Sequence, residues 1–123
     1  MLAQDRGDYQ EAARQYQRSL DISERLGDQV GMATCCSQFG SLVAERGGPV
    51  ADIVAWHIRA LAIRLRIGVP QAVNNLRQLL PYRRELGTES FAALLAQITD
   101  DVELVEAIPG LLDQLDAAEG HTT

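Results

Sequence analysis

The chain has 123 residues, enough for one domain, and its 46 % hydrophobic content is ordinary for a globular protein. It starts without the apolar core of a signal peptide, and no apolar run reaches the roughly 18 residues that a membrane span needs. Its formal net charge of −6 disfavours nucleic acid, so we expect neither a nucleic acid nor a membrane as a partner. Adjacent cysteines pair only with strain, so Cys35 and Cys36 indicate reduced thiols and a cytoplasmic protein.

Charge is distributed unevenly along the chain. Residues 1–86 carry all 11 arginines and 9 acidic residues, whereas residues 87–123 carry 8 acidic residues and no basic one. The acidic final section argues further against a nucleic acid or an anionic membrane docking there.

The first predicted element is an amphipathic helix that ends at Gly27. Apolar residues recur at spacings of three and four from Tyr9 to Leu26, and period-two alternation is absent from the chain. Asp8 can cap the start of this helix, with Glu11 as its capping-box partner. The periodicity therefore predicts an all-α protein.

Five further helices follow in the prediction. Glycines stop several of them, and Thr99, with the two aspartates after it, is expected to cap the last. Pro81 should kink or split the fourth helix, and Pro109-Gly110 should break the sixth into two short pieces. The second to fifth helices are predicted over residues 30–46, 50–67, 71–86 and 89–98.

An internal repeat organises these helices. QYQRSLDISERLG, residues 15–27, aligns with WHIRALAIRLRIG, residues 56–68, at an offset of 41 residues. Arg18 then falls on Arg59 and Gly27 falls on Gly68. A repeat of about 40 residues made of two helices indicates a helical solenoid.

Small and aromatic residues recur at set positions of the two units. They are Gly7, Tyr9, Ala12, Tyr16, Ser19 and Leu20 in the first, and Phe39, Gly40, Gly47 or Gly48, Ala60 and Leu61 in the second. In these residues the chain resembles the tetratricopeptide repeat family, in the long-period variety of kinesin light chains and large actinobacterial signalling proteins. The resemblance implies antiparallel helix-turn-helix repeats in a short right-handed superhelix, with a small residue at the helix crossing (Gly40) and a C-terminal capping helix.

The repeat also predicts boundaries. We expect a truncated unit over 1–28, a unit over 29–68, a degenerate unit over 69–98, acidic capping helices over 99–117 and a disordered tail over 118–123. If Gly7 is a turn, residues 1–6 are only the end of a preceding helix. The chain is then a fragment of a larger protein, has a misplaced start, or takes the missing helix from a partner. We expect the first of these.

An open first repeat is expected to expose an apolar face. Exposed repeat ends associate, so we predict self-association through this face. Its residues are Tyr9, Ala13, Tyr16 and Leu20.

Catalytic chemistry is not indicated. His57 and the two cysteines lie on apolar helix faces, which favours a packing role, and His121 lies in the expected tail. No metal-ligand spacing and no phosphate loop is present in the sequence, so we predict no catalytic residue, no metal and no cofactor. A thiol enzyme using Cys35 or Cys36 remains as a remote alternative.

Binding is the favoured function. The resemblance implies a groove lined by the first helix of each pair, namely Thr34, Ser37, Ser41, Glu45, Asn74, Arg77, Arg84 and Glu85. Two arginines and an asparagine there could hold a carboxylate or an acidic peptide, and the alternative is a plain exposed face. We predict a non-enzymatic protein–protein interaction module that binds a peptide or helix. The other candidate is a C-terminal regulatory or assembly region of a larger bacterial signalling or transcriptional regulator.

Overall fold

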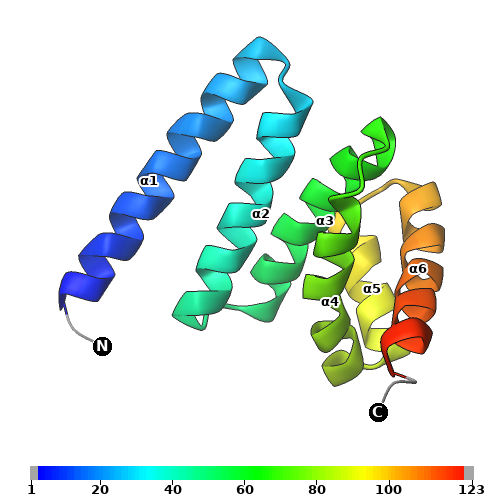
Figure 1. Cartoon of the computed structure of the whole chain (residues 1–123). Helices are drawn as coiled ribbons and strands as arrows, with labels where there is room; N and C mark the ends of the chain where they lie inside the picture. The colour runs from blue at the N-terminus through cyan, green and yellow to red at the C-terminus, as the bar shows by residue number, and fades with distance from the viewer. Residues whose placement is uncertain (1–2, 121–123) are drawn as a thin grey trace. The chain divides into compact units, whose positions relative to one another are not determined.

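The computed structural model describes residues 3–120 of the chain, and the side chains of residues 7–119. Over this range it contains six α-helices and no strand, which confirms the all-α prediction (Figure 1). The helices are α1 (Ala3–Leu26), α2 (Gln29–Arg46), α3 (Val50–Ile67), α4 (Ala72–Leu86), α5 (Thr88–Ile98) and α6 (Val102–Gly120).

The predicted turn at Gly7 is wrong. Helix α1 runs without interruption from Ala3 to Leu26, so Asp8 lies inside the helix and does not cap it. Glu11 instead pairs with Arg14 one turn further on, at 2.6 Å. A glycine inside a helix costs only about 1 kcal/mol, less than the packing of a long amphipathic face contributes.

Two prolines also failed to act as breaks. Helix α4 is one helix that contains Pro81, and α6 is one helix that contains Pro109, so the predicted division of the sixth helix is wrong. Ile108 and Leu112, on either side of Pro109, are fully buried, and this packing outweighs the one backbone hydrogen bond that proline removes. Helix α6 also covers residues 118–120 of the predicted tail, and residues 121–123 lie outside the described range.

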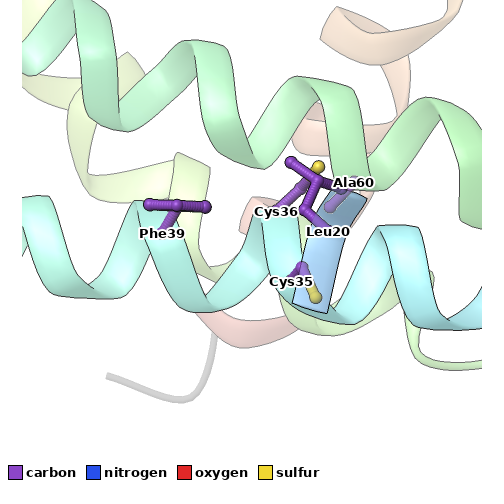
Figure 2. Close-up of a cluster of buried hydrophobic side chains, with 5 residues drawn as sticks. All are labelled: Leu20, Cys35, Cys36, Phe39 and Ala60. Atoms are coloured by element: carbon purple, nitrogen blue, oxygen red, sulfur yellow. The ribbon is translucent and has the colours of Figure 1, made fainter. Parts of the chain in front are cut away.

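The chain divides after Val69 into two compact units, and each is described by itself. In the first unit, α2 packs against both α1 and α3 (Figure 1). Small and aromatic side chains from all three helices form its buried cluster, drawn in Figure 2. The cluster consists of Leu20, Cys35, Cys36, Phe39 and Ala60.

The ends of α1 and α3 share one geometry. Gly27 and Gly68 both adopt a left-handed backbone, with φ of 69° and 72°, a conformation that glycine enters without strain. The next residue in each case returns a backbone hydrogen bond to the last helical turn, from Asp28 to Ser23 (2.8 Å) and from Val69 to Arg64 (3.2 Å). The 41-residue offset of the sequence is therefore repeated in the helix ends.

In the second unit, α4, α5 and α6 pack against one another. The side chain of Asp101 begins α6, because it accepts hydrogen bonds from the backbone N–H groups of Glu103 (3.0 Å) and Leu104 (3.3 Å). Thr99 supports this cap by accepting from the N–H of Asp101 at 3.1 Å. Buried side chains of this unit include Leu79, Leu80, Phe91, Leu95, Ile108 and Leu112.

Candidate functional site

A hollow of about 380 Å³ lies between α1 and α2. A smaller hollow of about 180 Å³ adjoins it, and the two share Tyr16, Leu42 and Glu45. We refer to both together as the α1–α2 groove. Its remaining lining residues are Asp8, Tyr9, Ala12, Ser37, Gln38, Ser41 and Arg46.

Two aromatic rings, those of Tyr9 and Tyr16, line the floor of the groove, and Tyr16 contacts a row of rings that lies outside the lining. Tyr16 meets the ring of Phe39 edge-on, with the centroids 5.8 Å apart. Phe39 in turn stacks on Trp56 of α3 at 4.4 Å and an interplanar angle of 14°. Rings held in this way present a preorganised apolar surface to a ligand.

Charge in the groove is mostly negative. The guanidinium of Arg46 lies 4.3 Å from the centroid of the Tyr9 ring, a cation–π contact that fixes both side chains. Asp8 and Glu45 have no hydrogen-bond or ion-pair partner among the side chains that the structure describes. Two carboxylates are therefore available at the edge of an aromatic floor.

Three of the four predicted groove residues on α2 line the α1–α2 groove: Ser37, Ser41 and Glu45. Thr34 does not line it, and its hydroxyl donates to the carbonyl oxygen of Val30 at 3.0 Å. These residues had been expected in a groove from the family resemblance, and in α2 their spacing of three and four residues puts them on one face.

The predicted residues of the second unit have a different environment. Asn74, Arg77, Arg84 and Glu85 are exposed on α4, but Arg77 pairs with Glu119 of α6 at 2.9 Å, and Arg84 pairs with Asp116. The neighbouring Arg83, which was not predicted, pairs with Asp113 at 2.5 Å. These arginines have carboxylate partners within the chain, so an acidic peptide on α4 would have to compete with those ion pairs.

The predicted exposed association face needs correction. Leu20 is only 2 % exposed, and Ala13 and Tyr16 pack against the buried cluster, because this side of α1 faces α2. Tyr9 is half-buried under Arg46. Tyr9 and Tyr16 are thus groove residues, and the four side chains do not form an open apolar end.

The thiols and the imidazole are placed for packing. Cys35 and Cys36 are buried free thiols, and burial raises the pKa of both, which is the opposite of what a thiolate nucleophile needs. Burial, with a contribution from the Arg64 guanidinium, lowers the pKa of His57 to about 4, so the ring is neutral at pH 7. His121, the other histidine of the sequence, lies outside the described residues.

Two further properties of the described residues bear on the site. Within the described part of the chain, no three histidine, cysteine or acidic side chains come together as a metal site. Over the same residues, no helix has the length and apolar character to cross a membrane.

Several groove residues were not predicted from sequence. Tyr9 and Tyr16 were assigned to an end face, while Leu42, Gln38 and Arg46 were assigned to no site. The signal that could have found them is the pairing of α1 with α2, which follows from the two-residue connection after Leu26.

Comparison of the chain with protein-family models, with curated proteins and with solved structures finds no match. The function is therefore argued from the residues of this chain.

Proposed function

We propose that the chain is a non-enzymatic protein-interaction module, similar to tetratricopeptide repeats, that binds a helix or peptide in the α1–α2 groove. The observation that carries this proposal is the groove itself, which is lined by the rings of Tyr9 and Tyr16 and by two carboxylates that have no partner among the described side chains. Ligand sites of this kind combine an apolar surface with a few polar groups that fix orientation.

The repeat supports the architecture. Gly27 and Gly68 end helices at equivalent positions, and Gly40 of α2 lies against the His57 ring of α3. A small residue at a helix crossing is what the resemblance implies for a repeat of two antiparallel helices.

The charges of the groove favour a basic ligand. Arg77 and Arg84, expected to hold an acidic peptide, already have carboxylate partners on α6, whereas Asp8 and Glu45 have none among the described side chains. We infer a ligand that places an apolar or aromatic anchor on Tyr16 and a Lys or Arg beside Glu45.

Two synthetic peptides test this function. Both are helical, about 16 residues long and share one Leu and Phe stripe, and they differ only in carrying Lys or Glu beside it. In an NMR titration of the intact chain, the Lys peptide should shift the amide signals of Tyr9, Tyr16 and Ser41 to saturation. The Glu peptide should bind at least about tenfold more weakly.

Matched variants locate the binding. Glu45→Gln should weaken the Lys peptide, whereas Thr34→Ala, on the same helix but outside the groove, should leave its affinity unchanged. Equal binding of both peptides, or shifts confined to α4, would refute the proposed groove.

A further inference from the structure

A line of residues on α1, apart from the groove, is exposed, whereas three of its four repeat counterparts on α3 are buried or partly buried. We call it the outer stripe, and it consists of Gln15, Ser19, Ile22 and Leu26. Ile22 is 47 % exposed and Leu26 is 76 % exposed, and the two lie one helical turn apart on the same face.

The 41-residue offset places the outer stripe on Trp56, Ala60, Ile63 and Ile67 of α3. There Ala60 is fully buried and Ile63 is only 5 % exposed, whereas Ser19 is exposed. Two of the four α3 positions are thus buried and Trp56 is partly buried, whereas Ile67, the counterpart of Leu26, is itself 36 % exposed.

Helix α2 covers part of this α3 face. Ala60 lies in one buried cluster with Cys36 and Phe39 of α2, and Trp56 stacks on the Phe39 ring. The α2 face that does this combines a small residue, Cys36, with an aromatic residue three positions later and Gly40 one position after that. This is the template for a helix that fits the outer stripe.

Charge adds a second requirement. Arg18 and Arg25 flank the outer stripe, and neither has an ion-pair or hydrogen-bond partner among the described side chains. Helices α2 and α3 run antiparallel through the tight turn at residues 47–49, so an α2-like occupant of α1 would begin near Arg25. An acidic residue at its start would meet that guanidinium.

We propose that the outer stripe is a docking surface for an amphipathic helix of a partner protein. This helix has an α2-like face, with a small residue, an aromatic residue three positions later and a glycine directly after it, and it carries an acidic residue at its start. The surface is distinct from the α1–α2 groove, so it adds a second binding site and stands whether or not the groove binds a peptide.

The probe is a fluorescein-labelled synthetic peptide with the sequence of residues 28–47, in which both cysteines are replaced by alanine. Added to the intact chain, it should bind saturably by fluorescence anisotropy. Ile22→Asp should weaken binding at least about tenfold, because a carboxylate would be buried against the apolar face. Val102→Asp, at an apolar side chain of the second unit that is 65 % exposed, is the matched control and should bind as the unmodified chain does.

The peptide itself supplies the charge test. Replacing its first residue, Asp28→Asn, keeps a capping side chain but removes the charge. This change should weaken binding to the unmodified chain several-fold. It should not weaken binding to the Arg25→Gln variant, which lacks the guanidinium. Circular dichroism and thermal melting should show that all variants fold.

Two outcomes overturn the proposal. One is the absence of saturable binding up to about 1 mM peptide. The other is binding that Ile22→Asp leaves unchanged, since a peptide that replaces the chain's own α2 does not need the outer stripe. If the Lys peptide does not bind the α1–α2 groove but the peptide of residues 28–47 still binds the chain, only the proposed function is refuted.

Discussion

Gly40 of α2 lies directly against the imidazole of His57 on α3. A Cβ atom built on Gly40 would be 2.6 Å from Nε2 and 2.7 Å from Cδ2, closer than carbon atoms approach in folded proteins. Both residues are buried, so the ring has little room to move away. The spacing between these two helices is therefore set by the absence of one methyl group.

Gly40→Ala should destabilise the chain by about 1–3 kcal/mol, because over-packing forces the helices apart. Chemical denaturation followed by circular dichroism measures this change. Gly110→Ala is the control, since its Cβ would meet nothing within 4 Å in the middle of α6. This second change should stabilise the chain by about 0.5–1 kcal/mol through helix propensity. Equal effects of the two changes would contradict the close packing.

The burial of His57 makes stability depend on pH. Its pKa falls from 6.5 to about 4 on folding, so below pH 6.5 the unfolded chain binds a proton that the folded chain does not. The free energy of unfolding should therefore be greatest above pH 6.5 and decrease towards pH 4, by about 3 kcal/mol from this group.

Urea unfolding at pH 7 and about pH 5 tests this dependence, because ordinary carboxylates titrate mostly below that window. His57→Gln should be less stable at pH 7 but should lose much less stability between the two pH values. If the unmodified chain and the variant have the same pH dependence, His57 is not buried in its neutral form.

The sequence placed most helices because their limits are local. The bounds of α3, Val50–Ile67, and its stop at Gly68 agree with the prediction, since apolar periodicity and a C-terminal glycine are encoded within the segment. Gly7 and Pro109 were misjudged as breaks, because packing on other helices decides whether a helix continues through such a residue.

The candidate site was less predictable for the same reason. The family resemblance predicted Ser41 and Glu45 as groove residues, and their separation of four residues keeps them on one face of α2, which is a local property. The pairing of Arg84 with Asp116, 32 residues later, depends on how α4 and α6 pack, and no spacing rule contains it. Whether an arginine is available to a ligand thus depends on tertiary packing. The sequence alone therefore favoured an acidic ligand, whereas the structure favours a basic one.

The cap of α6 gives a pairwise test between adjacent aspartates. Asp101 accepts two backbone hydrogen bonds at the start of the helix, whereas Asp100 accepts none that the structure describes. Asp101→Ala should cost about 1 kcal/mol, and Asp100→Ala should cost little, although both remove the same charge near the helix start. Thermal denaturation of the two variants measures the difference. Equal losses would mean that charge alone, and not the cap, stabilises α6.

The two cysteines test the alternative of a thiol enzyme. Cys35 and Cys36 are 5 % and 0 % exposed, and burial raises the pKa of both thiols, so little thiolate forms at pH 7. Reaction with a chromogenic disulfide reagent at pH 7 should therefore be much slower in the folded chain than in guanidinium chloride. Gly40→Ala should speed the reaction by increasing the population of opened molecules, and Gly110→Ala should not. If either thiol of the folded chain reacts as fast as in the denatured chain, it is accessible and ionised, and the proposed non-enzymatic function must be reconsidered.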